Sequence, residues 1–510
     1  MKQYELFEIS LQGGNPGDSW ALAAPEAVFT NGDEKIRTRG FYDGDGCYKV
    51  RFLPEKPGLW HWCITGAVEA EGSEYCEESN QHGPVRAEET HFRYADGKLY
   101  LPFGTTVYAL AHQSQELIQT TMESLRKSPF NKVRFCVFPK SYRYNQNEPI
   151  YYPFSRKSDG QWNVYQPNPD FWHNFESCVA QLNTYGIEAD IILFHPYDRW
   201  GFAAMTREEN LVYLDYAMRR LAAYPNVWWS MANEYDLCLN YKSVSDWEEI
   251  EATISGNDPW HHLLSNHNCF EPWDFNRPAI THASIQTKRL ADVANWVHSG
   301  GKPVIIDECC YEGNIPDYWG SISGKEMVSR FWQVLVSGGY CTHGETYLDP
   351  NDILWWAKGG TLKGSSPERI RYLKQIAEQL PGPVEPMEDT AAWLVHASEE
   401  ELRNAAASLP EDEKGLLLGM TLMKPEDRRV HVALEHRWCG HCGTDAYILY
   451  LAQRTCAEEH LSLPKDRAYK IDLIDTWNMK RETILDKVSG DVKIPLPGKE
   501  FYAVLALAQE

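Results

Sequence analysis

Apolar runs alternate with amphipathic segments through the middle of the chain, from Asp96 to about Leu380. Eight short runs are typical of strands, over residues 100–104, 132–138, 188–194, 227–231, 262–266, 279–283, 303–306 and 339–343. Segments with apolar residues at helical spacing lie between most of them, over residues 115–127, 170–185, 207–224, 246–255, 288–298 and 325–336. Eight such units in succession predict a closed (β/α)₈ TIM barrel. An open doubly wound sheet is the alternative, but no glycine-rich phosphate loop follows the first strand.

The regions on either side of this middle segment have a different pattern. Residues 1 to about 92 consist of short strand-like runs separated by turn sequences such as Asp43-Gly44-Asp45-Gly46, which is typical of an Ig-like β-sandwich. From about Val384 onward we expect strands to dominate again. The chain is therefore predicted to be multidomain, with an N-terminal Ig-like β-sandwich (1–92), a catalytic barrel (93–383) and a C-terminal β-sandwich (384–510).

Composition and charge narrow the classes of partner. The 510 residues are 43% hydrophobic and 13% aromatic, which is enough to bury more than one core. The 72 acidic and 49 basic residues give a formal charge of −23. That charge disfavours nucleic acid and anionic membranes as partners, whereas a neutral carbohydrate substrate suits it.

The distribution of apolar residues and cysteines indicates where the protein resides. The first residues contain no apolar segment of the kind found in export signals, and no long uninterrupted apolar run follows. Thirteen cysteines, an odd number, are scattered through apolar segments such as Phe135-Cys136-Val137, which favours reduced, buried thiols. We therefore expect a soluble cytoplasmic protein without a cofactor or metal. The flanking domains could bring chains together, so a homo-oligomer is left open.

Two of the predicted strands end in a carboxylate. The fourth leads into Asn233-Glu234 and the seventh into Asp307-Glu308. If both strands are parallel members of one barrel, Glu234 and Glu308 emerge at its C-terminal rim, where barrel enzymes carry their chemistry. Two facing carboxylates suggest glycoside hydrolysis, with retention of configuration at a separation of about 5–5.5 Å and inversion at about 6.5–9.5 Å.

Polar and aromatic residues follow the other predicted strands toward the same rim. Aromatic faces stack on sugar rings, while His, Asn and Tyr side chains bond hydroxyl groups, so this rim suits a carbohydrate. The residues predicted to contact substrate are Asn233, His112, His195, Tyr235, His282, His343 and Trp355.

At this point the chain resembles a known group of enzymes. Asn-Glu at the end of the fourth strand and Glu at the end of the seventh resemble the signature of clan A retaining glycoside hydrolases. The segment from Phe92 to Thr106, FRYADGKLYLPFGTT, resembles the opening of the apiosidase-like bacterial barrels, and the flanking segments are similar to domains that such enzymes carry. The resemblance implies that Glu234 is the acid/base and Glu308 the nucleophile of a double displacement, with Asn233 bonded to the substrate's 2-hydroxyl.

Three alternatives are left open by the sequence. If the seventh strand is shifted, Glu345 or Glu312 would replace Glu308 as nucleophile. A non-catalytic carbohydrate-binding protein could be built on the same barrel. A minor alternative is thiol-disulfide redox chemistry through Cys439 and Cys442, since Trp438-Cys439-Gly440-His441-Cys442 matches the motif of disulfide isomerases.

Overall fold

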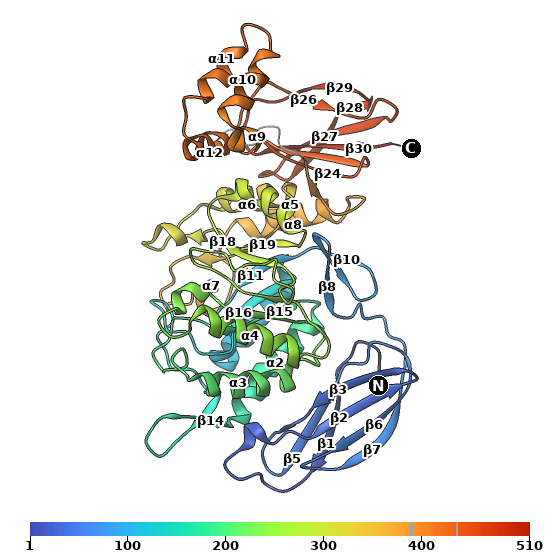
Figure 1. Ribbon diagram of the computed structural model, residues 1–510, viewed down its shortest axis with the longest axis vertical. Coiled ribbons are helices and arrows are strands. Elements are labelled where there is room, and N and C mark those ends of the chain that lie inside the picture. Colours follow the sequence, from blue (N-terminus) through green and yellow to red (C-terminus); the bar gives the residue numbers. More distant parts are fainter. Residues whose placement is uncertain (388–391, 435–436, 510) are drawn as a thin grey trace. The chain divides into compact units, whose positions relative to one another are not determined.

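The computed structural model describes residues 1–387, 392–434 and 437–509 (Figure 1). These residues form two compact units. The first comprises Met1–Lys288, Ser299–Met327 and Tyr340–Lys374. The second comprises Arg289–His298, Val328–Gly339 and the described residues from Gln375 onward.

A parallel barrel of eight strands forms the centre of the first unit. In order around the sheet, its strands are β17 (Leu264–Ser265), β16 (Val227–Ala232), β15 (Glu188–Phe194), β12 (Lys132–Cys136), β11 (Phe103–Thr106), β21 (Tyr340–His343), β19 (Val304–Glu308) and β18 (Ala283–Gln286). A parallel bridge between His267 and Ser284 joins the two ends of this sheet. The predicted TIM barrel is thereby confirmed.

Helices lie between the strands as the sequence pattern predicts. They are α1 (Gln115–Lys127), α2 (Pro169–Thr184), α3 (Arg207–Leu221), α4 (Val244–Asn257), α5 (Val293–Gly300) and α6 (Gly324–Val336), followed by α7 (Trp355–Lys358) and α8 (Ser366–Ala377). Side-chain caps fix several of their starts. Thr206, for example, forms a capping box with Glu209 at the start of α3.

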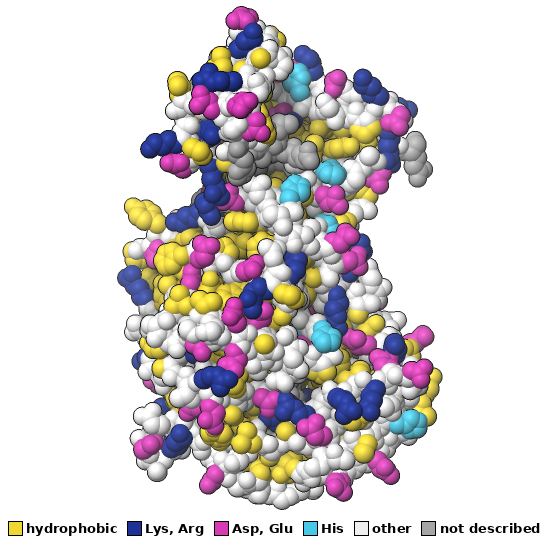
Figure 2. All heavy atoms as spheres, in the orientation of Figure 1, with side chains coloured by type: hydrophobic (Ala, Val, Ile, Leu, Met, Phe, Trp, Pro, Cys, Tyr) yellow, Lys and Arg dark blue, Asp and Glu magenta, His cyan; other side chains and the backbone are white. Residues whose placement is uncertain are grey.

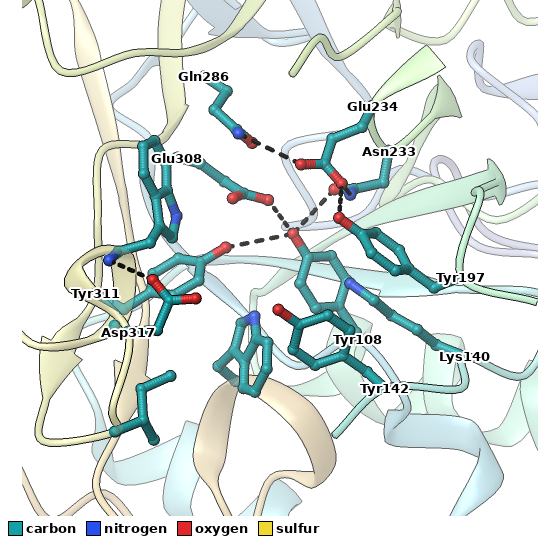
Figure 3. A pocket seen from close by; sticks show the side chains of 14 residues that line it. Tyr108, Lys140, Tyr142, Tyr197, Asn233, Glu234, Gln286, Glu308, Tyr311 and Asp317 are labelled. Atoms are coloured by element: carbon teal, nitrogen blue, oxygen red, sulfur yellow. Dashed lines mark hydrogen bonds between the residues drawn. The ribbon is translucent and has the colours of Figure 1, made fainter. Parts of the chain in front are cut away.

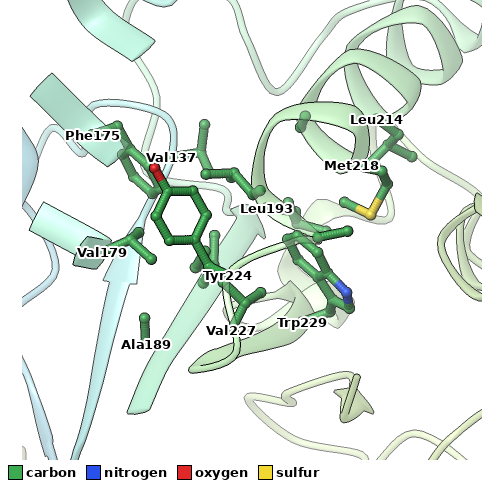
Figure 4. Close-up of a cluster of buried hydrophobic side chains, with 14 of the residues drawn as sticks. Val137, Phe175, Val179, Ala189, Leu193, Leu214, Met218, Tyr224, Val227 and Trp229 are labelled. Carbon is green, nitrogen blue, oxygen red and sulfur yellow. The ribbon is translucent and has the colours of Figure 1, made fainter. Parts of the chain in front are cut away.

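Apolar side chains on the outer faces of the strands pack against the helices. Val137 and Leu193 follow this pattern, and Figure 4 shows them with Phe175 of α2 and Met218 of α3 in one cluster of buried residues. The residues that alternate with them, such as Lys132 and Arg134 on β12, point into the barrel instead. This alternation, with its period of two, determines which residues fill the interior.

The barrel interior is charged rather than apolar. The Lys132 ammonium lies 2.7 Å from carboxylate oxygens of both Asp190 and Asp307, and all three side chains are buried. Arg134 Nε lies 3.5 Å from Asp190 and 3.8 Å from Asp307. Although burial alone would raise the pKa of Asp307, the charges of Lys132 and Arg134 outweigh it and hold that pKa well below the ordinary value. Two cations therefore balance two carboxylates inside the barrel.

A small antiparallel sheet covers the N-terminal end of the barrel. It contains β8 (Val85–Glu88), β9 (His91–Tyr94) and β10 (Leu99–Tyr100). Phe92 packs against Trp228 and His282, with ring centroids 5.2 and 5.5 Å apart. The end opposite the predicted rim is thus filled by apolar side chains.

The sixth barrel strand differs from its prediction. The sequence favours residues 279–283, but β18 begins at Ala283 and ends at Gln286. The apolar segment Ala279-Ile280 precedes this strand. The backbone N–H of Thr281 donates to Leu264 O at 2.9 Å, just before the strand begins. Gln286 therefore takes the place at the C-terminal end that the sequence assigned to His282.

Two antiparallel sheets precede the barrel. One contains β1 (Phe7–Gln12), β5 (Cys47–Phe52) and β4 (Phe41–Tyr42), and the other contains β3 (Glu34–Arg39), β2 (Glu26–Asn31), β6 (Gly58–Thr65) and β7 (Ala70–Cys76). Phe29 of the second sheet stacks on Phe52 of the first, with ring centroids 4.0 Å apart. The N-terminal region is therefore a β-sandwich, as predicted.

The second unit contains a further antiparallel sheet. Its strands are β23 (Glu385–Pro386), β24 (Trp438–Cys442), β25 (Ala446–Tyr450), β30 (Tyr502–Ala508), β27 (Tyr469–Asp475) and β28 (Lys480–Val488), and β26 (Glu458–Ser462) pairs separately with β29 (Asp491–Pro495).

Helices also occur in this region, where the sequence analysis expected strands from Val384 onward. They are α9 (Ala392–His396), α10 (Glu399–Ala407), α11 (Lys414–Met420) and α12 (Pro425–Leu434). Their start signals are present in the sequence, namely the capping box of Ser398 with Glu401 and a proline in the first turn of α12. No helix of the described chain is long and apolar enough to cross a membrane.

We predict that Lys132→Met will destabilise the barrel by about 3–5 kcal/mol, because it removes the cation nearest to two buried carboxylates and leaves only Arg134, at longer distance, to balance both. Urea unfolding followed by tryptophan fluorescence measures the loss. The control is Lys127→Met on α1, whose side chain is 71% exposed and which should cost no more than about 0.5 kcal/mol. Equal midpoints for the two variants would contradict the role given to Lys132.

Candidate active site

A cavity of about 190 Å³ opens at the C-terminal ends of the barrel strands (Figure 3). Aromatic and polar side chains from several strand ends make its wall. The lining residues are Tyr108, Lys140, Tyr142, Tyr197, Asn233, Glu234, Gln286, Glu308, Tyr311, Ile315, Asp317, Trp319, Gly320 and Trp356. Three of the residues singled out from the sequence, Asn233, Glu234 and Glu308, are among them.

Glu234 follows β16 in a left-handed backbone conformation, with φ of 56°. Such a conformation is uncommon for residues other than glycine and tends to occur at functional sites. The Glu234 carboxylate accepts hydrogen bonds from the Tyr197 hydroxyl, from Asn233 Nδ2 at 3.0 Å and from Gln286 Nε2 at 3.3 Å. Donors from three different strand ends therefore hold this carboxylate in the cavity.

Glu308 reaches the cavity because β19 is irregular at its end. Ile306 pairs with Ile285 of β18, but the next pair is Glu308 with Gln286, so Asp307 is an extra residue. Such a bulge redirects the side chains that follow it. Asp307 binds Lys132 inside the barrel, while Glu308, the next residue, lines the cavity.

The Glu308 carboxylate has hydroxyl donors and a cation beside it. The Tyr108 hydroxyl donates to Glu308 Oε1, and Arg134 Nη1 lies 3.9 Å from the same oxygen. Burial, and secondly the charge of Glu234, raise the pKa of Glu308, whereas Arg134 and Tyr108 act in the opposite direction. The charge of Glu234 therefore makes ionisation of Glu308 less favourable.

Polar contacts through Tyr108 and Asn233 link the two carboxylates, and the single proton of the Tyr108 hydroxyl faces both Glu308 Oε1 and Asn233 Oδ1. The Tyr108 hydroxyl lies 2.9 Å from Asn233 Oδ1, and Asn233 in turn donates to Glu234. The Tyr311 hydroxyl lies 3.4 Å from that of Tyr108, as Figure 3 shows. Asn233 and Tyr108 thus fix the position of one carboxylate relative to the other.

Lys140 adds a buried cation to the wall. Its ammonium lies over the rings of Tyr108 and Tyr197, 3.3 and 4.2 Å from their centroids. Burial lowers the pKa of Lys140, while the charges of Glu234 and Glu308 act to raise it. The cavity therefore combines two carboxylates with a cation and several aromatic faces.

The remaining predicted contacts lie outside this cavity, and two of them are histidines bonded to the backbone. His112 Nε2 lies 3.0 Å from Val137 O, and His195 Nε2 lies 3.1 Å from Phe138 O. Burial lowers the pKa of His112 to about 4 and that of His195 to about 3, so both rings are neutral at pH 7. Their strand-end positions serve the packing of the barrel.

The other four predicted contacts are also held by neighbouring side chains. Tyr235 packs on Trp247 and Trp273, and His282 lies at the N-terminal end against Phe92 and Trp228. His343 Nδ1 lies 3.2 Å from Thr105 Oγ1, to which Trp355 Nε1 also donates at 2.9 Å. The adjacent Trp356, and not Trp355, lines the cavity.

Several residues of the cavity were missed by the sequence analysis. Tyr108, Lys140, Tyr142 and Tyr197 all follow strands that the pattern predicts, so their positions were a usable signal. Gln286 required the correct end of β18. Tyr311, Asp317 and Trp319 lie in the segment after β19, which no periodic pattern places.

The two substitute nucleophiles lie outside the cavity lining. Glu312 and Glu345 are buried on two short strands, β20 (Glu312–Gly313) and β22 (Glu345–Thr346), which pair in parallel. Burial is the largest cause that raises the pKa of Glu345, to about 7. Neither side chain is placed to attack a sugar in the cavity.

The redox alternative is not supported by the geometry around Cys439 and Cys442. Both residues lie on strand β24 rather than at a helix N-terminus, and neither is in a disulfide. Burial raises the pKa of Cys442 to about 11, which is the opposite of what a reactive thiol needs. The motif WCGHC is therefore part of a sheet.

Comparison with protein families identifies the class to which this site belongs. The family model of the apiosidase-like catalytic domain matches residues 86–381. Two domains of unknown function match the flanks, DUF5060 over residues 1–66 and DUF5605 over residues 435–506. A search of curated proteins gave no match.

Solved structures agree with this family. A candidate glycoside hydrolase from Bacteroides vulgatus has 31% sequence identity and a TM-score of 0.84, with 100% of this chain and 99% of that chain covered. A glycoside hydrolase family 5 protein from the same organism has the same general fold at 14% identity and a TM-score of 0.58, with 84% and 93% covered. The fold is that of the glycoside hydrolases, and the chain belongs to the apiosidase-like family.

Proposed function

We propose that this protein is a retaining glycosidase in which Glu234 is the acid/base and Glu308 the nucleophile. The observation that supports it most directly is that both carboxylates, from the ends of β16 and β19, line one cavity. In such a reaction Glu308 attacks the anomeric carbon while Glu234 protonates the leaving oxygen. Glu234 then takes a proton from water, which attacks the anomeric carbon and releases Glu308 with net retention.

The surroundings of each carboxylate support this division of roles. Arg134 and the hydroxyl of Tyr108 stabilise the ionised form of Glu308, as a nucleophile requires. Burial raises the pKa of Glu308 in the protein without substrate, and a raised pKa on its own would suit the acid rather than the nucleophile. In the transition state, however, the anomeric carbon becomes positive and stabilises a carboxylate beside it. We therefore assign the two roles from the strand positions of the residues and from the donors around Glu308.

The size of the cavity favours a small substrate. Its volume of about 190 Å³ lies below the roughly 300–1,000 Å³ of pockets that hold drug-sized ligands. One sugar ring can be enclosed there, with Trp319, Trp356 and Tyr142 as faces for stacking. We therefore propose action on the terminal sugar of a small glycoside or oligosaccharide.

Charge and cysteine chemistry support the proposed partners and location. Figure 2 shows Lys and Arg side chains scattered among Asp and Glu on the visible face, which favours a neutral ligand over nucleic acid. None of the thirteen cysteines, all of which lie in the described residues, forms a disulfide, and the thiols of Cys309 and Cys341 are hydrogen-bonded with sulfurs 3.6 Å apart. A reducing compartment such as the cytoplasm suits these thiols.

The division into domains is part of the proposal. The three family models match separate stretches, 1–66, 86–381 and 435–506, which supports boundaries near residues 92 and 383. The N-terminal sandwich is proposed to be Ig-like on the basis of its two antiparallel sheets.

We predict that Glu308→Gln will abolish hydrolysis of any aryl glycoside that the wild type cleaves, because the amide cannot act as nucleophile. Release of nitrophenol from a panel of α- and β-linked pentosides and hexosides measures activity. We expect a loss of at least about 10⁴-fold, while Glu116→Gln on the exposed start of α1 should retain full activity. Wild-type rates for Glu308→Gln would exclude this assignment. Glycan binding without hydrolysis by the wild type would instead indicate a carbohydrate-binding protein.

A second prediction concerns the acidic limb of the pH profile of kcat/KM. The Tyr108 hydrogen bond lowers the pKa of Glu308, so Tyr108→Phe should raise it. Because the nucleophile must be ionised, the limb should move to higher pH. A hydrogen bond to a charged group contributes about 1.5–3 kcal/mol, equivalent to roughly 1–2 pH units.

The matched control is Tyr142→Phe, which also removes one tyrosine hydroxyl from the lining of this cavity. No hydrogen bond joins the Tyr142 hydroxyl to either carboxylate within the described chain, so its acidic limb should coincide with that of the wild type. Equal limbs for Tyr108→Phe and Tyr142→Phe would show that Tyr108 does not control the ionisation of the nucleophile.

A further inference from the structure

Three buried side chains converge behind the cavity wall. They are Glu312 of β20, His343 at the end of β21 and Glu345 of β22, none more than 1% exposed. One imidazole nitrogen and one carboxylate oxygen from each glutamate lie within 4.8 Å of one another. Two carboxylates and an imidazole in such proximity are a common ligand set for divalent cations.

Backbone amides fix both carboxylates in place. Glu312 accepts hydrogen bonds from the N–H groups of Ser365 and Ser366 at 2.7 and 3.1 Å. Glu345 accepts from those of Lys363 and Gly364, each at 2.7 Å. Glu312 Oε1 also accepts from the hydroxyls of Ser365 and Tyr347, each at 3.1 Å, so it is saturated. Glu312 Oε2 and both oxygens of Glu345 each accept one of the backbone bonds and keep a lone pair for a further partner.

Glycine is required where the backbone passes closest to these oxygens. A Cβ atom on Gly364 would lie 2.4 Å from Glu312 Oε2 and 2.7 Å from Glu345 Oε2. A Cβ on Gly324 would lie 2.6 Å from Glu312 Oε1. A side chain at either glycine would force these carboxylates to move, so the backbone fits closely around the pair where it now lies.

The negative charge of the pair is not balanced by the lysine beside it. The Lys363 ammonium is directed to Asp349 at 2.9 Å and to Ile353 O at 2.8 Å. Two buried carboxylates this close together repel each other, and a cation bound between them would relieve that repulsion.

His343 supplies the independent observation that favours a metal. Its Nδ1 lies 3.2 Å from Thr105 Oγ1, whereas its Nε2 is fully buried and has no hydrogen-bond partner. A buried polar atom without a partner is costly, which calls for a ligand at this position. With the proton on Nδ1, His343 donates it to Thr105 Oγ1 and keeps the Nε2 lone pair for a ligand, which is the usual arrangement of a histidine that binds metal.

We propose that Glu312, His343 and Glu345 bind one divalent cation. The ligand set suits an ion that accepts both carboxylate and imidazole, such as Mn²⁺ or Zn²⁺. An ion about 2.0–2.2 Å from each ligand atom keeps any two of them within about 4.4 Å. Shifts of the ligand atoms by a few tenths of an ångström therefore complete the site. The sequence analysis expected no metal.

The ion would hold the segment that forms one wall of the cavity. Glu312 follows Tyr311, whose hydroxyl lies in the hydrogen-bonded chain beside Glu308. Gly344, between the other two ligands, is so close to the Tyr311 ring that a Cβ there would lie 1.9 Å from it. The cation thus positions Tyr311 and touches no reacting atom.

Metal analysis of the intact protein tests this proposal without any substrate. We expect about one divalent ion per chain in protein purified without chelator, measured by inductively coupled plasma mass spectrometry. After dialysis against EDTA, the protein should bind one Mn²⁺, followed by loss of the electron paramagnetic resonance signal of free Mn²⁺. Mn²⁺ is the probe because cysteine thiols, of which the chain has thirteen outside any disulfide, prefer softer metals.

Variants identify the ligands. His343→Gln and Glu345→Gln should each weaken Mn²⁺ binding by at least about 100-fold, since loss of a second-shell partner alone costs about 10–100-fold. Glu116→Gln, far from the site in sequence and exposed on α1, should bind as the wild type does. If one variant does not fold, the wild-type titration still decides whether an ion binds, and the other variant decides whether these residues hold it.

Two results would overturn the proposal. One is wild-type protein that carries no divalent ion and does not bind Mn²⁺ at millimolar concentration, in which case the carboxylates share a proton. The other is stoichiometric binding that His343→Gln and Glu345→Gln leave unchanged, which would locate the ion elsewhere. Neither result depends on whether the protein cleaves a glycoside.

Discussion

The ion pairs of Lys132 with Asp190 and Asp307 are the interaction on which the barrel and its site depend. A carboxylate inside a barrel is tolerated only when a cation neutralises it, and here Lys132 contacts both at 2.7 Å. Asp307 also accepts hydrogen bonds from Ser284 and Thr342 at 2.6 and 2.8 Å, so strands β12, β15, β18, β19 and β21 are joined across the interior. This network fixes the end of β19, where Glu308 lines the cavity.

The bulge at Asp307 connects that network to the chemistry. In a regular strand, neighbouring residues point to opposite faces, so Asp307 and Glu308 could not both point inward. The extra residue in β19 allows Asp307 to bind Lys132 and Glu308 to line the cavity. Arg134 lies 3.8 Å from Asp307 and 3.9 Å from Glu308, so its positive charge stabilises the interior carboxylate and the candidate nucleophile alike.

The sequence predicted the barrel because apolar strand runs and amphipathic helices are local patterns, visible over residues 188–194 and 115–127 respectively. It also predicted Glu234 and Glu308 as strand-end carboxylates, and both line the cavity. The histidines were harder to interpret, because His112 and His195 bond backbone carbonyls that only the folded chain brings near. His282 was misplaced by a strand boundary four residues away, and Tyr311 lies in an irregular segment that periodicity cannot place.

Proton NMR of the first-formed sugar tests the central claim most directly, since the anomeric configuration reports whether the two carboxylates act by double displacement. With any glycoside that the wild type cleaves, spectra recorded before mutarotation should show the anomer with the configuration of the substrate. Release of the opposite anomer would mean that water attacks directly, and Glu308 would then be a base rather than a nucleophile.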